Sequence, residues 1–259
     1  MRVLIMSSGG KDSSYATWWA ILRGWEVSGL VTIRVTGGDS MMFQVPSTAL
    51  VAMQAASADL PWLPISIEGH EEDEMNQLEV ALEQIVHGSG KPRSDIWSSA
   101  ERSEAVWPDG WKWPNNLRRL RASGPIEGLV VGAIRSDYQK TRIEQMCNRL
   151  GIRSFTPLWH HNGISHMRNL VSHGHDVMMT SVSTDGLGKE WLGRMLDMND
   201  VDELEKLSDE YRFNIDGEGG EFETAVLGAP WMKTKIKTNH TIHWTGHRGW
   251  VDILGAELA

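Results

Sequence analysis

The seven-residue segment Ser7–Ser13 (SSGGKDS) constrains the fold of this chain more than any other feature of its sequence. It follows the short apolar segment Arg2–Met6, which predicts a buried strand, and it leads into Asp12–Leu22, which predicts a helix. Gly9 and Gly10 permit backbone conformations closed to other residues and let the main chain approach an anion closely. A strand, a glycine-rich turn and a helix in this order predict an α/β fold with a phosphate site at the first helix N-terminus.

The side chains of this loop suit a nucleotide polyphosphate. Lys11 supplies a positive charge for the phosphates, and the hydroxyls of Ser8 and Ser13 can add hydrogen bonds. Asp12 would repel bare phosphate, so we expect it to act through Mg²⁺. The sequence contains no Walker loop, which needs Gly, four residues and then Gly-Lys-Ser/Thr. We expect nucleotide contacts from Ser7, Ser8, Gly9, Gly10, Lys11, Asp12 and Ser13, with Lys11 and Asp12 also catalytic and Asp12 the Mg²⁺ ligand.

Strand-like and helical segments alternate along most of the chain, which predicts a Rossmann-like parallel sheet with helices on both faces. The loops after such strands share the carboxyl edge, where ligands bind. Further predicted strands are Val27–Val35, Leu63–Ile67, Gly128–Ile134, Arg153–Phe155 and Val177–Val182. Further predicted helices are Thr48–Ala58 with Ser47 as its N-cap, Glu71–Val86, Ser136–Leu150, Ile164–Ser172 and Val201–Tyr211, and the tail from 235 to 254 reads as extended.

We divide the chain into an ATP-binding domain, residues 1–134, and a smaller C-terminal substrate-binding domain, residues 135–259. Residues 88–124 interrupt the first domain with several Gly and Pro residues, and they hold four of the chain's 13 tryptophans: Trp97, Trp107, Trp111 and Trp113. We interpret this segment as a surface insertion that packs its tryptophans onto the body. The alternative is a docking surface for a macromolecular partner, since Trp and Arg are favoured interface anchors.

Charge and cysteine content exclude several classes of protein. A formal net charge of −9 argues against stable nucleic-acid binding. Cys147 is the single cysteine, so there is no internal disulfide and no CxxC motif, which fits a reducing, cytoplasmic setting. The apolar N-terminal segment is too short for a signal peptide or a membrane span. The pairs and sets of histidines at 160–161 and 240–247 are interpreted as surface or packing residues.

Three further strings supply candidate site residues: Gly38–Phe43 (GDSMMF), Gly132–Arg142 (GAIRSDYQKTR) and Gly217–Thr224 (GEGGEFET). In the second string, Ser136 is a predicted N-cap, which would leave free N–H groups for an anion. In the third, carboxylates this close repel one another unless a cation or a basic group compensates. We expect one of Glu218, Glu221 and Glu223 to hold Mg²⁺, to contact ammonium or to act as the base, and the choice among them stays open.

Together with Pro157–Trp159, these strings resemble the diphthine–ammonia ligase family, and SGGKDS itself resembles the pyrophosphate loop of N-type ATP pyrophosphatases. The resemblance runs from residue 1 to about 87 and from about 125 to 235, so the insertion and part of the tail lie outside it. It implies a fold of the adenine nucleotide alpha hydrolase type, ATP and Mg²⁺ as cofactors, and cleavage of ATP to AMP and pyrophosphate. It also implies that diphthine on translation elongation factor 2 is adenylated at its carboxylate and then amidated by ammonium.

The resemblance and the strings together complete the set of expected site residues. Nucleotide contacts are expected also from Asp39, Ser40, Gly132 and Ser136. Substrate contacts are expected from Tyr138, Gln139, Arg142, Gly219 and Gly220, and catalytic roles from Lys11, Asp12, Glu218, Glu221 and Glu223.

Two other functions stay open at this point. One is a different adenylating enzyme with the same loop, acting on a tRNA base or a cofactor precursor, although the negative charge disfavours tRNA. The other is a nucleotide-sensing module that binds ATP without turnover, since related folds do this. Sulfur transfer is disfavoured because it commonly needs a second cysteine. A homodimer is one alternative for the oligomeric state.

Overall fold

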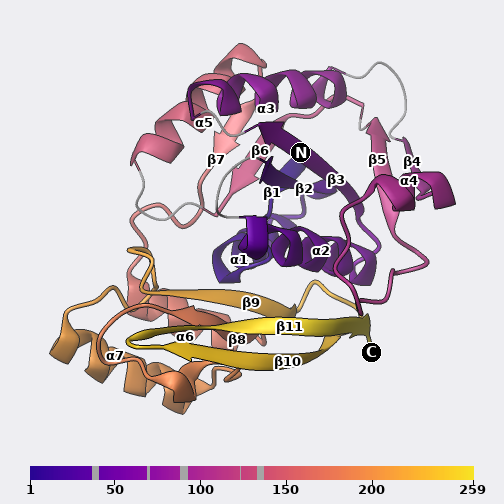
Figure 1. Ribbon diagram of the computed structural model, residues 1–259. Helices are drawn as coiled ribbons and strands as arrows, with labels where there is room; N and C mark the ends of the chain where they lie inside the picture. The colour runs from indigo at the N-terminus through magenta and orange to yellow at the C-terminus, as the bar shows by residue number, and fades with distance from the viewer. Residues whose placement is uncertain (37–40, 69–70, 88–92, 123, 133–136) are drawn as a thin grey trace.

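The computed structural model of the chain describes residues 1–36, 41–68, 71–87, 93–122, 124–132 and 137–259, and it shows the α/β fold that the sequence predicts (Figure 1). The strands are β1 (Arg2–Met6), β2 (Glu26–Thr36), β3 (Pro61–Glu68), β4 (Arg93–Ile96), β5 (Arg118–Ala122), β6 (Gly128–Val131), β7 (Arg153–Phe155), β8 (Asp176–Val182), β9 (Phe222–Gly228), β10 (Ile236–Thr245) and β11 (Arg248–Leu258). The α-helices are α1 (Lys11–Leu22), α2 (Met41–Ser57), α3 (Glu71–Val86), α4 (Ser99–Glu104), α5 (Asp137–Arg149), α6 (Gly163–Ser172) and α7 (Met198–Tyr211).

The first sheet has seven strands in the order β4-β5-β3-β2-β1-β6-β7 and is parallel except for β4, which runs antiparallel to β5. Alternate residues of β1 enter different cores: Val3 and Ile5 pack with α1 and α2, whereas Leu4 packs with α3 and α5. Helices therefore cover both faces. The strand order reverses between β1 and β6, which places the ligand crevice of such a sheet at the carboxyl ends of these two strands.

The second sheet is antiparallel, in the order β10-β11-β8-β9, and confirms a second, smaller unit towards the C-terminus. Figure 1 shows α1 and α2 lying between the two sheets. Leu50 and Met53 of α2 pack there against Met178 of β8 and Leu227 of β9. The second sheet begins at β8, and the domain boundary at residues 134 and 135 stays a prediction.

The start of α2 differs from the sequence-based expectation. The helix begins at Met41 rather than Thr48, so Ser47 lies inside it and is not its N-cap. The helix continues through Pro46, although proline lacks an N–H and removes one intrahelical hydrogen bond. Burial of Ala49–Met53 between the sheets outweighs the loss of a single hydrogen bond.

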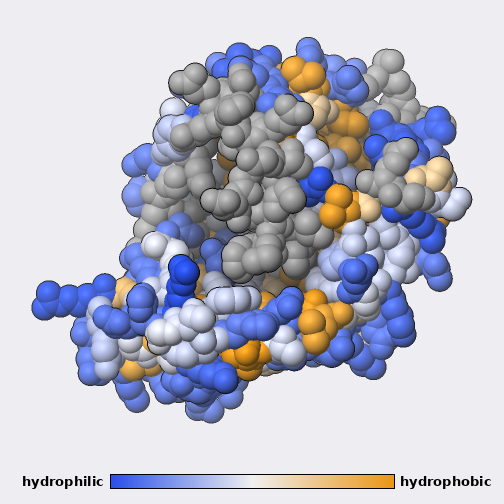
Figure 2. All heavy atoms as spheres, in the orientation of Figure 1, coloured by the Kyte–Doolittle hydropathy of each residue, from blue (hydrophilic) through white to orange (hydrophobic). Residues whose placement is uncertain are grey.

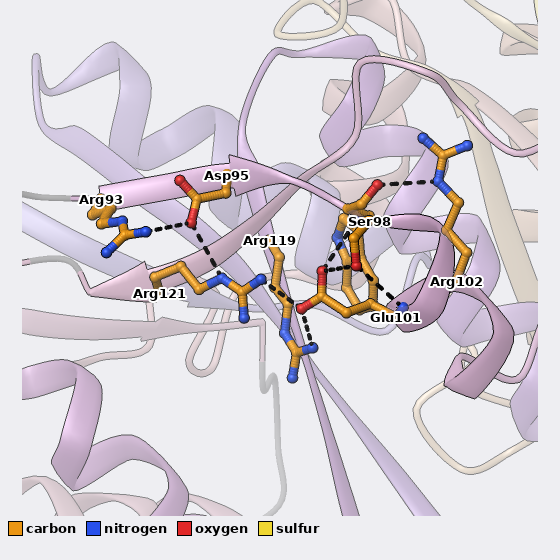
Figure 3. A network of polar contacts seen from close by, with 8 residues as sticks. Arg93, Asp95, Ser98, Glu101, Arg102, Arg119 and Arg121 are labelled. Carbon is orange, nitrogen blue, oxygen red and sulfur yellow. Dashed lines mark hydrogen bonds and ion pairs between the residues drawn. The ribbon is translucent and has the colours of Figure 1, made fainter.

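The described part of the segment 88–124, residues 93–122 and 124, is not a surface excursion, because it contributes two strands and a helix to the first unit. β5 pairs in parallel with β3, and β4 extends the edge beyond it. Figure 3 shows how Glu101 of α4 accepts hydrogen bonds from Arg119 and Arg121 of β5. The backbone N–H of Ser98 and the Arg121 guanidinium lower the pKa of Glu101 to about 2. The carboxylate of Glu101 is therefore ionised at neutral pH, and its ion pairs with Arg119 and Arg121 hold α4 against β5.

The tryptophans of this segment pack onto the body, as expected from the sequence. Trp97 is buried, with its ring centroid 5.2 Å from that of Trp62 and 5.5 Å from that of Trp113. Trp111 is buried against the second unit, and its indole N–H donates to the carbonyl of Ile253 in β11 over 3.0 Å. Residues 93–122, which we call the strap, therefore contact both sheets.

Replacing Gly110 in this strap with alanine should destabilise the protein more than the same change at Gly246. Both glycines have positive φ, +80° and +62°, so alanine strains both backbones. A Cβ at Gly110 would also collide with the Leu254 carbonyl, whereas one at Gly246 meets open space. We expect an additional loss of about 1–3 kcal/mol for G110A, measured by chemical denaturation. Equal losses for the two variants would show that the strap does not press on β11.

The exposed face in Figure 2 is mostly hydrophilic, with hydrophobic residues gathered in small separate patches among the residues that are coloured. Within the described parts of the chain, no helix combines the length and the apolar character that crossing a membrane requires.

Candidate active site

The loop between β1 and α1 has the backbone geometry of an anion cradle. Gly9 has a φ of +85°, a region that side chains with a Cβ avoid. The hydroxyl of Ser13 organises the turn, because it accepts the N–H of Ser8 over 3.3 Å and donates to the carbonyl of Gly10 over 3.1 Å. Gly10 is the N-cap of α1 in an extended conformation and supplies no side chain. The first turn of α1 is therefore uncapped by its own loop.

Several N–H groups of this turn are available to a ligand. The N–H of Lys11 donates to the Thr224 hydroxyl of β9 over 3.2 Å. The N–H groups of Gly10, Asp12 and Ser13 have no hydrogen-bond partner within the described ranges of the chain. Unpaired N–H groups at a helix N-terminus attract anions, through hydrogen bonds and the positive end of the helix dipole. The loop can hold phosphate oxygens with its backbone alone.

The loop is held from two sides by residues that the sequence pattern did not indicate. The buried amide of Gln54 in α2 donates to the carbonyls of Gly9, over 3.0 Å, and of Val226 in β9, over 2.8 Å. The N–H of Val226 in turn donates to the Gly9 carbonyl over 3.0 Å. Gln54 looks like any polar residue in a helix, so only the tertiary structure shows that it joins the loop to the second sheet.

Lys11 and Asp12 form an ion pair at the start of α1. Lys11 Nζ lies 2.8 Å from Asp12 Oδ2, and the Lys11 side chain is buried. Nε2 of His166, from α6, lies 2.8 Å from Asp12 Oδ1. Burial raises the pKa of the Asp12 carboxyl, but the charge of Lys11 and the interactions with His166 lower it by more. The pKa of Asp12 therefore lies below its ordinary value, and the group is ionised.

The structure brings Glu223 to the loop and uses Glu221 differently. Crowding by protein atoms and the nearby charge of Asp12 raise the pKa of Glu223, against the opposing effect of Lys11, although its side chain stays accessible to solvent. Glu221 instead accepts N–H groups of Asn214 and Gly219 over 2.9 Å and 2.7 Å. These hydrogen bonds outweigh burial and lower the pKa of Glu221. Glu221 shapes the turn, and Glu223 lies near enough to the loop for the charges of Lys11 and Asp12 to act on its pKa.

Gly132 directly follows β6 and lies against the first turn of α1. A Cβ at Gly132 would lie 2.7 Å from the backbone N of Ser13, so a larger residue would displace the loop. Arg142 of α5 donates a hydrogen bond to the hydroxyl of Tyr138, which is largely exposed at the start of that helix. Glu218 is half-buried, and Gly219 and Gly220 are exposed at the turn. Asp39, Ser40, Ser136 and the side chain of Gln139 lie outside the described residues.

The groups around the loop fit a magnesium ion that arrives with phosphates. In the described parts of the chain, His, Cys, Asp and Glu do not form a group of three or more that could hold a metal by itself. Mg²⁺ is usually held by one or two carboxylates together with phosphate oxygens and water, so a larger protein cluster is not required. Asp12 and Glu223 supply hard oxygen donors whose mutual repulsion a cation would relieve.

A cradle of free N–H groups, a buried lysine and an ionised aspartate at the switch point of a parallel sheet define a nucleotide-using α/β enzyme with a phosphate loop. Comparison with protein families gives the particular family. The Diphthamide synthase N-terminal domain matches residues 1–104 and 110–154, and the Diphthamide synthase C-terminal domain matches residues 162–258. The chain belongs to the diphthamide synthase family, as the motifs predicted.

Individual relatives support the same family assignment. The chain is 30% identical to diphthine–ammonia ligase of Homo sapiens over 91% of its own length and 82% of the relative's. The match to the Rattus norvegicus protein of the same name has the same identity and coverage. The Schizosaccharomyces pombe protein of that name is 29% identical over 91% of this chain, which spans 36% of that longer protein.

The family match also corrects the range of residues over which the motifs predicted a resemblance to the family. Most of residues 88–124, and the tail up to residue 258, fall within the matched regions rather than outside the family pattern. A solved structure described as a predicted subunit of tRNA methyltransferase from Methanocaldococcus jannaschii covers 89% of this chain and 98% of its own. At 17% identity and a TM-score of 0.40, that similarity supports no conclusion about fold or function.

Proposed function

We propose that this chain is a diphthine–ammonia ligase that uses ATP to amidate diphthine on translation elongation factor 2. The observation that supports the proposal most is the meeting of two distant strings. The N–H of Lys11 in the phosphate loop donates to the hydroxyl of Thr224 in the GEGGEFET string over 3.2 Å, and the charges of Lys11 and Asp12 act on the pKa of Glu223 in the same string. The relatives from Homo sapiens and Rattus norvegicus are named diphthine–ammonia ligase.

The proposed reaction has two steps. The diphthine carboxylate attacks the α-phosphorus of ATP, which forms an acyl-adenylate and releases pyrophosphate. Ammonia then attacks the acyl carbon, the bond to AMP breaks, and the proton lost by nitrogen goes to a base. A carboxylate is a poor electrophile and AMP is a good leaving group, so most of the catalysis would come from positioning and from stabilising charge at the α-phosphate.

We assign a separate role in this reaction to each residue of the loop. The free N–H groups of Gly10, Asp12 and Ser13 bind phosphate oxygens, and Lys11 stabilises the charge that develops as pyrophosphate leaves. Asp12 would hold Mg²⁺, which supplies charge neutralisation of the phosphates when it is bound. A carboxylate with a raised pKa also suits the acceptance of a proton from the attacking nitrogen, which we assign to Glu223.

The second unit and the switch point supply the remaining proposed contacts. We assign diphthine binding to the C-terminal domain and the entrance of the crevice, with the turn shaped by Glu221 as one wall. The proposed substrate contacts are Tyr138, Gln139, Arg142, Gly219 and Gly220, and Glu218 is assigned to the ammonium. The further nucleotide contacts proposed are Asp39, Ser40, Gly132 and Ser136.

An omission assay tests the proposal. ATP, ammonium, Mg²⁺ and diphthine-modified elongation factor 2 are combined with the enzyme, and each is left out in turn while AMP and pyrophosphate are measured. We expect both products in stoichiometric amounts with amidated factor only when all components are present. AMP release that is equal with unmodified factor would contradict the assigned acceptor, and stimulation by tRNA would instead favour a nucleic-acid substrate.

A further inference from the structure

His166 lies in the second unit, yet its imidazole contacts the phosphate loop. The side chain is 1% exposed, and Nε2 lies 2.8 Å from Oδ1 of Asp12, 154 positions away in the sequence. We infer that His166 is a positioning residue that fixes the Asp12 carboxylate for the metal and phosphates. The inference rests on the proposed function, because that proposal makes Asp12 a ligand of the metal that accompanies ATP.

The surroundings of His166 determine which nitrogen carries its proton. Nδ1 is buried and has no hydrogen-bond partner among the residues that the structure describes. A protonated Nδ1 would leave a buried N–H unsatisfied, which is costly, whereas an unprotonated Nδ1 loses only an acceptor interaction. The imidazole therefore carries its hydrogen on Nε2 and donates it to Asp12. A histidine that orients a ligating carboxylate in this way belongs to the outer shell of a metal site.

The imidazole is itself held in one orientation. Its ring meets the ring of Tyr15 edge-on, with centroids 5.3 Å apart and planes at 87°. The neighbouring Met167 and Leu170 of α6 are buried in the core shared with β8. Because this packing fixes the donor, the position of Oδ1 of Asp12 is set by the second unit rather than by the loop.

The contact matters most when the nucleotide arrives. In the structure, Oδ2 of Asp12 is paired with Lys11 and Oδ1 with His166. A bound phosphate would attract the Lys11 ammonium, and Oδ2 of Asp12 would then be free to hold the cation. His166 then remains as the contact that keeps the plane of the carboxylate aligned. Without it, Asp12 would rotate freely and bind the cation less well.

Two substitutions of similar size separate the hydrogen bond from packing. The amide nitrogen of glutamine can reach the place of Nε2, whereas that of asparagine reaches only the place of Nδ1. The probe is Mn²⁺ with α,β-methylene-ATP, which cannot be cleaved between its α- and β-phosphates, and bound Mn²⁺ is measured by electron paramagnetic resonance. H166N should raise the Kd for Mn²⁺ by about 10–100-fold, and H166Q should restore wild-type affinity.

His175 and Asp12 provide the controls. His175 is 3% exposed and lies in the same aromatic cluster around Tyr15 without contacting Asp12, so H175N should lower the Tm and leave the Kd unchanged. D12N should abolish the Mn²⁺ site. Loss of affinity in D12N alone, with both His166 variants binding normally, would overturn the positioning role and leave the proposed function standing. Equal weakening by H166Q and H166N would overturn the role of the hydrogen bond, and normal binding by D12N would overturn the metal site and this inference together.

Discussion

Replacing Lys11 with methionine should reduce the formation of AMP and pyrophosphate by about 10²–10³-fold while the protein stays folded. The ammonium is the positive charge that the loop offers to phosphates, and removing one such group from a water-poor site commonly has an effect of this size. Methionine keeps a flexible apolar stem of similar length, so the packing of the buried side chain near Phe222 is retained. Turnover in the complete assay, together with the Tm, measures the effect.

A second lysine shows whether the loss is specific to the loop. Lys206 is exposed on α7, so K206M removes the same charge at a distance from the phosphates. It should leave turnover unchanged. If K11M turned over ATP at the wild-type rate, Lys11 would have no part in stabilising the leaving pyrophosphate.

Replacing Glu223 with glutamine should lower turnover by about 10²–10⁴-fold and at the same time make the ligand-free protein more stable at neutral pH. Crowding and the charge of Asp12 raise the pKa of Glu223 above its ordinary value of 4.5, which means that folding disfavours the ionised form. Glutamine removes that unfavourable charge. Function would therefore depend on a group that opposes folding, as is common at active sites.

The direction in which the pKa of Glu223 is shifted determines how the stability difference between E223Q and the wild type depends on pH. A group whose pKa rises on folding contributes stability below its unfolded pKa and loses that contribution as pH increases through its folded pKa. The advantage of E223Q over the wild type should therefore be present at pH 7 and should shrink as pH falls through the raised pKa towards 4.5. The acid limb of the wild-type pH–rate profile should lie above pH 4.5 and should disappear in E223Q.

The pKa of Glu221 is shifted in the opposite direction to that of Glu223, so E221Q serves as the comparison. Its pKa is lowered by hydrogen bonds from Asn214 and Gly219, so its ionised form favours folding. E221Q should destabilise the protein at pH 7, and its deficit should shrink as pH falls. Urea denaturation of both variants across this pH range is the measurement. Destabilisation by E223Q at neutral pH would contradict the raised pKa.

Much of the fold could be predicted from local sequence, and the exceptions have a common cause. The strand at Arg2–Met6 and the helix at Glu71–Val86 were predicted with the bounds that the structure shows, because their apolar periodicity is complete within each segment. The segment from 88 to 124 was misjudged as a surface excursion. Its strands β4 and β5 are short and polar; β5 is a strand because it pairs with the edge of β3, and β4 pairs in turn with β5. Local patterns do not encode such pairing.

The candidate active site likewise contains some features that the sequence determines and others that only the tertiary structure determines. The sequence by itself determined the phosphate loop, since Gly9 and Gly10 at a strand-to-helix junction permit backbone conformations that other residues avoid, and it marked the carboxylates of Gly217–Thr224 as candidates. The tertiary structure decided that Glu221 shapes its own turn while Glu223 lies within reach of the charges of the loop, and it added Gln54 and His166, which no motif marks. A backbone conformation follows from neighbouring residues, whereas the charge and hydrogen-bond partners of a side chain depend on segments that only folding brings together.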